Sequence, residues 1–501
     1  MRLLCNSYSA DYYAPLASVY QNTTGVSIHF DAVSTLPEQA AVQLRSISSP
    51  GVLNLTHEAW LVNPSALGDG LASQAFADLS QLVSLDNRLQ WTDLFTQIRE
   101  AGLIYGRQLH YREDLLAKYN KTVPRTWHQL VQTASELNGT EGKWGFCGNW
   151  GPCALLGTNL VKLILASMTQ TLGASQGWLI DPESLMQLMG TPAMIETLNI
   201  IKALHRLSSP FISTAQDCSL PVAQFVTDAC FMTISYGTTF KPHPDLFRYL
   251  QPNGSMMLVN HSPGFEATLA TINAQSAPEL RFFSYSVLSY LASPGVMDTL
   301  VLNPNTENMP TRVSQLDVGR WAAAGYHADD AARFLATHQA SLQHPNMHVQ
   351  VRIPSASSFV SMATTMAFEA TQDKDPQQII SDAVTAAVTN FDALFGTNYD
   401  LFRSWYFASL NRQLYQPPPP SPPPPPSPPQ LGAGTSQPTN PIVSTPGIIA
   451  IAVGLGSVVL AIIIALLARP YLKQLWVNQR TWRQAPGVGP LTCLLVTDIQ
   501  E

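Results

Sequence analysis

The chain has 501 residues and is weakly acidic, with 34 Asp and Glu against 27 Lys and Arg and a formal net charge of −7. Its length accommodates two or more domains, and its 12% of charged residues falls well below the roughly 25% usual in soluble proteins. Residues 1–446 hold 23 basic and 32 acidic side chains, and this net charge of −9 argues against nucleic acid or anionic lipid as their ligand.

The N-terminal stretch has the pattern of a parallel α/β sheet. Residues 2–6 are predicted to form a strand, and residues 12–22 a helix that Gly25 ends. Apolar residues then alternate over 26–30, which predicts a second strand. A strand, a helix and a strand in this order predict a parallel sheet covered by helices. No secretion signal precedes Arg2, so we expect the gene product to begin further upstream.

Helices and strands continue to alternate up to about residue 415, so the predicted fold class of this part is α/β. The clearest helix begins at Thr126, because Thr126 and Gln129 form a capping-box pattern before an apolar face that Gly139 ends. The same periodicities predict helices at 38–47, at 282–291 and after Asp375-Pro376, and strands at 60–62 and 231–235.

A proline-rich linker follows at residues 416–447. Its core, residues 417–429, reads PPPPSPPPPPSPP, which predicts a polyproline II rod of about 40 Å. A docking site for proline-binding modules is the alternative, but those modules are mostly cytoplasmic, so we favour a spacer. The run also resembles the Ser-Pro tracts of extensin-type cell-wall glycoproteins, and this resemblance implies exposure at a cell surface.

Residues 448–468 are predicted to cross a membrane. They contain no charge, and as a helix they rise about 31 Å, which matches a hydrocarbon core of about 30 Å. A buried core helix is the alternative. Basic residues follow the segment at Arg469, Lys473, Arg480 and Arg483, whereas none lies between Arg412 and it. The positive-inside rule therefore places 1–447 outside and 470–501 in the cytoplasm of a single-pass plasma-membrane protein.

Sequons and cysteines agree with an outside location. The six N-glycosylation sequons all precede the predicted span, at Asn22, Asn54, Asn120, Asn138, Asn253 and Asn260. The short spacings predict two local disulfides, Cys147–Cys153 and Cys218–Cys230, as expected in an oxidising compartment. Buried thiols are the alternative.

Residues 1–400 carry a series of motifs that resembles the solute-binding proteins of ABC transporters. YREDLLAKY (111–119) and VPRTWHQLVQTASELNG (123–139) are followed by FMTISYG (231–237), FFSYSVLSYLASPGV (282–296) and NMPTRVSQL (308–316) in the order found in that family. The resemblance implies a two-lobed type II periplasmic-binding fold over 1–415 and a small solute as ligand. At the cleft-forming ends, Trp60, Trp150 and Tyr236 are candidates for stacking on that ligand, with ordinary packing as the alternative.

One strand of that family is expected to be missing here. Its Val-x-Ala-Leu-Pro strand precedes the Tyr-x-x-Asp segment, yet YGRQ (105–108) runs almost directly into LHYREDLL (109–116). Loss of a strand that helps form the hinge predicts unpaired amides on the neighbouring strands.

The last twelve residues, PLTCLLVTDIQE (490–501), resemble the opening of a class III nucleotide cyclase domain. This resemblance implies two Mg or Mn ions, with Asp498 as a metal ligand and Ile499 as a carbonyl donor. It also implies a homodimer formed through the span and the cyclase domain. A strand-ending polar residue is the alternative interpretation of Asp498.

We therefore expect a single-pass receptor that senses a small external solute and is coupled to a cytoplasmic nucleotide cyclase. Twelve residues do not make a catalytic domain, so this chain by itself is expected to be inactive. A membrane-tethered solute-binding protein for transport or adhesion, without enzymatic output, is the alternative. The sequence specifies neither the ligand nor the choice between cAMP and cGMP.

Overall fold

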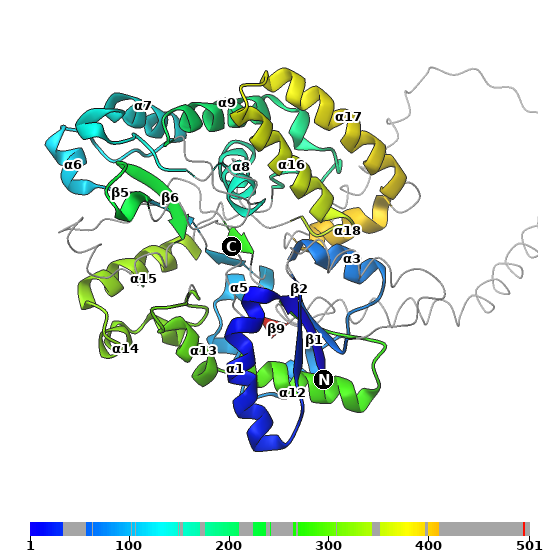
Figure 1. The fold of residues 1–501 in the computed structure, drawn as a ribbon. Coiled ribbons are helices and arrows are strands. Elements are labelled where there is room, and N and C mark those ends of the chain that lie inside the picture. The colour runs from blue at the N-terminus through cyan, green and yellow to red at the C-terminus, as the bar shows by residue number, and fades with distance from the viewer. Residues whose placement is uncertain are drawn as a thin grey trace, which may run out of the picture. The chain divides into compact units, whose positions relative to one another are not determined.

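The computed structural model describes residues 1–33, 57–62, 64–101, 103–105, 107–148, 150, 154–170, 176–209, 224–236, 241, 264–266, 269–306, 308–342, 351–395, 399–409 and 494–495. All of them belong to one compact unit, Met1–Gln413 together with Leu491–Glu501. Within this unit the elements form two α/β lobes, each built around its own strands (Figure 1).

The first lobe is organised by a mixed sheet of strand order β2-β1-β3-β8-β9. β1 (Arg2–Asn6) pairs in parallel with β2 (His29–Val33) and with β3 (Ala59–Val62), and α1 (Ser7–Thr24) connects β1 to β2. This confirms the predicted strand at 2–6 and the strand–helix–strand unit, although β2 begins three residues after Val26. β8 (Leu269–Ile272) is antiparallel to β3, which the sequence did not predict.

Residues 3–5 of β1 and 59–62 of β3 are buried on both faces of the sheet. Successive side chains of a strand point to opposite faces, so these residues contribute to two different cores. Leu3, Cys5 and Leu61 pack into one core with α1 and with α12 (Pro278–Leu291). Leu4 and Trp60 point the other way, into a second core. Figure 1 shows α1 and α12 on the same side of β1 and β2.

Further helices complete the first lobe. α12 confirms the helix predicted at 282–291, and the Ser293-Pro294 step starts the next helix instead of a loop. The other elements are α3 (Leu67–Ala72), α4 (Ser80–Leu85), α5 (Thr96–Ala101), α13 (Pro294–Val301), α14 (Val318–Ala323) and α15 (Ala328–Leu342).

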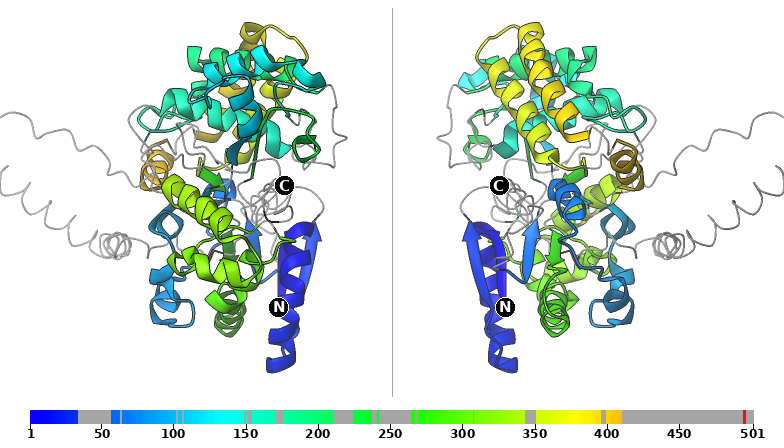
Figure 2. Two further views of the ribbon diagram at one scale, coloured as in Figure 1. Left: turned by 90° about the vertical axis from the view of Figure 1, so that its left-hand side faces the viewer. Right: turned by 90° about the vertical axis from the view of Figure 1, so that its right-hand side faces the viewer.

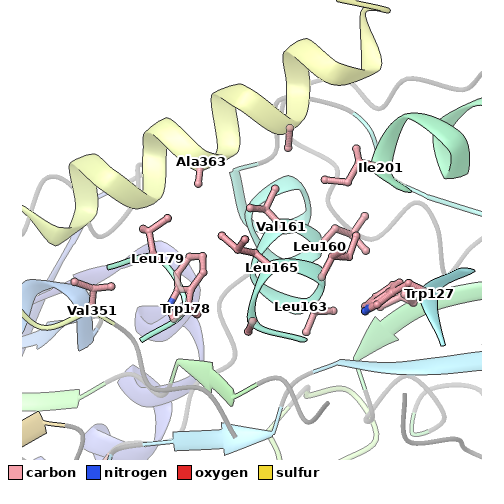
Figure 3. Packing of buried hydrophobic residues seen from close by; sticks show 14 of the residues in the cluster. Trp127, Leu160, Val161, Leu163, Leu165, Trp178, Leu179, Ile201, Val351 and Ala363 are labelled. Carbon is pink, nitrogen blue, oxygen red and sulfur yellow. The ribbon is translucent and has the colours of Figure 1, made fainter. Parts of the chain in front are cut away.

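The second lobe surrounds one apolar helix, α8 (Ala154–Thr169). Leu160, Val161 and Leu165 of α8 face the neighbouring helices and loops, as Figure 3 shows. α9 (Pro192–Arg206) and α16 (Ala356–Thr371) pack on α8, and α17 (Pro376–Phe395) packs on both α9 and α16 (Figure 2). α6 (Glu113–Lys118), α7 (Trp127–Leu137) and α18 (Tyr399–Ser409) complete this lobe.

The predicted start of α7 is confirmed in detail. The Thr126 hydroxyl accepts the backbone N–H of Gln129 at 3.1 Å, which satisfies one of the free amides at the start of the helix. The Gln129 side chain reaches back one residue further than a standard capping box, to the N–H of Arg125 at 2.8 Å. Gly139 follows the helix with a φ of +82°, as expected of a glycine that ends a helix.

Where a strand was expected to be missing, the structure describes two antiparallel pairs of strands. β4 (Leu103–Tyr105) pairs with β7 (Gly264–Glu266), and β5 (Arg107–Tyr111) pairs with β6 (Met232–Tyr236), both antiparallel. Gln108 and Leu109 are consecutive residues of β5, opposite Ser235 and Ile234. Within the described residues each of these sheets has two strands, so only one edge of β5 is paired, and unpaired amides at its other edge stay a prediction.

The two predicted disulfides, Cys147–Cys153 and Cys218–Cys230, are wrong. Cys147 forms a disulfide with Cys230, 83 residues away, and both side chains are fully buried. Residues 144–147 run alongside the start of β6, with the Cys147 N–H donating to the Met232 carbonyl at 2.8 Å. This strand-like pairing brings together two cysteines that are distant in sequence, whereas the prediction considered only short spacings. Cys153 and Cys218 lie outside the described residues.

No helix in the described ranges is long and apolar enough to cross a membrane. The predicted span at 448–468, the linker at 416–447 and the basic segment at 469–489 all lie outside these ranges, as does the helix predicted at 38–47. Within the last twelve residues, Leu494–Leu495 form the short strand β9. β9 pairs with β8 of the first lobe, Leu269 lying opposite Leu495.

A buried histidine makes stability depend on pH. His338 in α15 is fully buried, stacks on Phe334 and lies within 2.7 Å of the Pro310 carbonyl through Nε2. Burial lowers the pKa of His338 from 6.5 to about 4, against a smaller opposing effect of that hydrogen bond. The unfolded chain therefore binds a proton at His338 more readily than the folded chain does. The stability that the neutral, buried His338 contributes is complete above pH 6.5 and is lost as the pH falls toward 4.

Between pH 6.5 and pH 4, we expect the protonation of His338 to lower the free energy of unfolding by about 3 kcal/mol. His338→Gln retains an amide donor for the Pro310 carbonyl and does not titrate. Chemical denaturation of wild type and variant across this range should give a shallower decline for the variant. Equal slopes would contradict the assignment.

Candidate functional site

The two lobes are joined where β4 passes into β5, with residue 106 between them. Tyr105 ends β4 opposite Gly264, and Arg107 begins β5 opposite Tyr236. The backbone of Tyr236 therefore lies at the passage from one lobe to the other, where a two-lobed binding fold is expected to hold its ligand. The side chain of Tyr236 is outside the described part, so its stacking role stays a prediction.

Trp60 is a packing residue in this structure. It lies in β3, is 2% exposed and packs in the core with its ring 6.2 Å from that of Phe76. Its backbone carbonyl accepts the hydroxyl of Thr271 on the neighbouring strand at 3.3 Å. These contacts favour the packing alternative for Trp60, because no face of the indole is exposed to a solute.

Trp150 is also buried but has an unsatisfied donor. It is 6% exposed, and its ring meets His205 edge-on at 5.3 Å. Its indole Nε1 is buried and has no hydrogen-bond partner among the described residues. A buried N–H without an acceptor costs about 1–3 kcal/mol, so an acceptor that reached this donor would stabilise the structure. His205 stays largely neutral, because burial lowers its pKa more than the charge of Asp373 raises it.

Buried charged side chains are further polar groups that the sequence analysis did not single out. Lys241 is fully buried and donates to the Asn308 carbonyl at 3.2 Å and, at 3.4 Å, to the Thr306 hydroxyl. Arg352, five per cent exposed, precedes α16. For Arg352 the available signal was a lone charge between two apolar residues, Val351 and Ile353.

A third buried charge, Asp69, connects the lobes. Its carboxylate, 2% exposed, accepts the backbone N–H of Ser355 at 2.9 Å, where α16 begins. Beside it, Gly68 lies so close to the Ile353 carbonyl that a Cβ atom at position 68 would overlap it. Segments that are distant in sequence, one after β3 and one before α16, therefore meet in close contact.

The described residues contain no group of three His, Cys, Asp or Glu side chains placed to hold a metal ion. The proposed metal ligands Asp498 and Ile499 lie outside them. Of the sequons, Asn22, Asn120 and Asn138 are described and all three are exposed, whereas Asn54, Asn253 and Asn260 are not described.

The fold is that of ABC-transporter solute-binding proteins. A solute-binding protein from Agrobacterium radiobacter K84 in complex with ribitol matches with a TM-score of 0.61 and 15% identity, over 78% of this chain and 98% of that chain. Maltose-bound MalE3 of T. maritima matches with a TM-score of 0.58 and 12% identity, over 77% and 98%. A D-mannitol-bound protein from Agrobacterium vitis S4 matches with a TM-score of 0.58 and 13% identity, over 78% and 98%.

Sequence identities this low establish that the fold is alike, and they establish neither the ligand nor the role of this chain. No family model matches the chain, and no curated protein matches it. The predicted two-lobed solute-binding fold is therefore confirmed by structure, and these matches give no evidence for a cyclase domain.

Proposed function

We propose that the chain is an extracytoplasmic solute-binding protein whose ligand is a sugar or a polyol. The observation that carries the proposal is the match to nearly the full length of proteins solved with ribitol, maltose and D-mannitol. The unsatisfied indole N–H of Trp150 supports it, because a hydroxyl-rich ligand supplies acceptors to a buried donor. This is the binding protein without enzymatic output, which the sequence offered as its alternative.

Ligand titration tests the proposal. We expect one compound of a panel of ribitol, D-mannitol, maltose and D-tagatose to raise the melting temperature, since a ligand at 100 times its Kd stabilises by about 2.7 kcal/mol. Trp150→Phe removes the indole donor and should weaken binding about fivefold to tenfold in calorimetry. Trp60→Phe, the matched control, should lower stability and leave the affinity unchanged. A panel without effect at millimolar concentration would refute the sugar or polyol assignment.

The membrane tether, the homodimer and the coupled cyclase remain sequence-based proposals. The pairing of β9 with β8 opposes a span between them, because a strand on the inner side of a membrane does not pair with a sheet on the outer side. Leu269→Cys with Leu495→Cys distinguishes the two arrangements, since residues opposite each other on antiparallel strands have Cβ atoms about 5 Å apart. A disulfide between the two introduced cysteines of one chain would exclude the membrane span at 448–468. Terminal tags found on opposite sides of the membrane would exclude the pairing of β9 with β8.

A further inference from the structure

Two sequons that are separate in sequence lie on one face of the second lobe. Asn120 follows α6, and Asn138 follows α7. Figure 1 shows these two helices side by side. The neighbours of Asn120 on both sides bond to residues close to Asn138: the Lys121 ammonium to Glu136 at 2.7 Å, and the Tyr119 hydroxyl to Glu141 at 2.6 Å. Lys118 also pairs with Glu141.

These contacts hold the ends of the two helices together at neutral pH. Hydrogen bonds from Lys121 and Gln132 lower the pKa of Glu136, and those from Lys118 and Tyr119 lower the pKa of Glu141. Both glutamates are therefore ionised wherever an extracellular fluid is near neutral. We call the surface formed by residues 119–122 and 136–141 the α6–α7 face.

Both asparagines can carry a glycan without loss of a contact that the structure shows. Asn120 and Asn138 are exposed. Asn138 uses its side-chain oxygen, Oδ1, to accept the Gly145 N–H at 3.0 Å. A glycan is attached through the side-chain nitrogen, Nδ2, so this hydrogen bond persists after modification. The sequon threonines, Thr122 and Thr140, stand two residues after the asparagines.

We propose that the α6–α7 face carries two N-linked glycans, at Asn120 and Asn138, and is thereby excluded from docking to any protein partner. Two bulky, hydrated groups on one small face keep other macromolecules away from it. Partners of the chain then have to approach through other surfaces. The inference rests on the outward location in the proposed function but not on the identity of the ligand.

The test uses the full chain, expressed behind a cleavable secretion signal in a eukaryotic host. Thr122→Ala and Thr140→Ala remove the sequons while leaving both asparagines, and the Asn138–Gly145 hydrogen bond, in place. Each is expected to remove one N-glycosidase-sensitive step in electrophoretic mobility, and the double variant two. Thr122→Ser and Thr140→Ser preserve the sequons and should retain both steps.

Peptide mass mapping after N-glycosidase in heavy-oxygen water should mark Asn120 and Asn138 as converted to aspartate. Unmodified asparagine at both positions, in a chain that is glycosylated elsewhere, overturns the inference. A chain that carries both glycans but binds no sugar or polyol would refute the proposed ligand and leave this inference intact.

Discussion

Replacing Cys230 by serine is expected to lower the free energy of unfolding by about 4.5 kcal/mol under oxidising conditions. The Cys147–Cys230 bond closes a loop of 83 residues, and the chain-entropy model gives this value for a loop of that length. Cys230 is also fully buried, so the new serine hydroxyl would need a hydrogen-bond partner. Chemical denaturation of the oxidised and reduced wild type and of the variants measures the effect.

The pattern across variants identifies the partner of Cys147. Cys147→Ser, Cys230→Ser and the double variant should be similarly unstable, because each of them lacks the same bond. Cys153→Ser should retain the disulfide and serves as the control. Peptide mapping without reductant should recover Cys147 joined to Cys230. A Cys147–Cys153 peptide, with a stable Cys230→Ser variant, would refute the assignment.

Gly68→Ala is expected to destabilise the chain by about 3 kcal/mol or more. The added methyl group would overlap the backbone carbonyl of Ile353, and backbone yields less readily than the end of a side chain. The variant should also disturb the neighbouring Asp69–Ser355 hydrogen bond, because both contacts join the same two segments. Thermal denaturation gives the loss, and hydrogen exchange at the Ser355 amide reports on the contact between the segments.

Gly295→Ala is the matched control. Gly295 lies in the first turn of α13, and a Cβ atom there meets nothing within 4 Å. The same substitution should therefore be neutral or slightly stabilising, since alanine has the higher helix propensity. If Gly68→Ala were as stable as Gly295→Ala, the close contact between α3 and the segment before α16 would not exist in solution.

Local signals in the sequence predicted the elements well, and they predicted partners poorly. Thr126 accepts the Gln129 amide as its spacing indicates, and β1 spans the predicted residues 2–6. Helix caps and strand alternation act within a few residues, so a short window contains them. The five motifs in order also sufficed to predict the two-lobed solute-binding fold, which the structural comparisons confirm.

Local sequence patterns did not predict which distant segments of the chain contact each other. The antiparallel β8, the bond between Cys147 and Cys230, and the contact of Gly68 with Ile353 each join segments that are distant in sequence. A window around one partner contains nothing that identifies the other, because the partners are set by how the lobes pack. For the same reason Trp60 and Trp150 could not be distinguished in advance: one is packed on all sides, and the other retains a buried donor.

The bond between Cys147 and Cys230 has a consequence for the fate of a cleaved molecule. A protease that cuts once anywhere in residues 148–229 would sever the main chain and yet release no fragment, because the two pieces stay covalently attached. Such nicking would be invisible on an ordinary non-reducing gel and would appear as two bands after thiol treatment. A chain nicked in this way would therefore be taken for the intact protein until its disulfide is reduced.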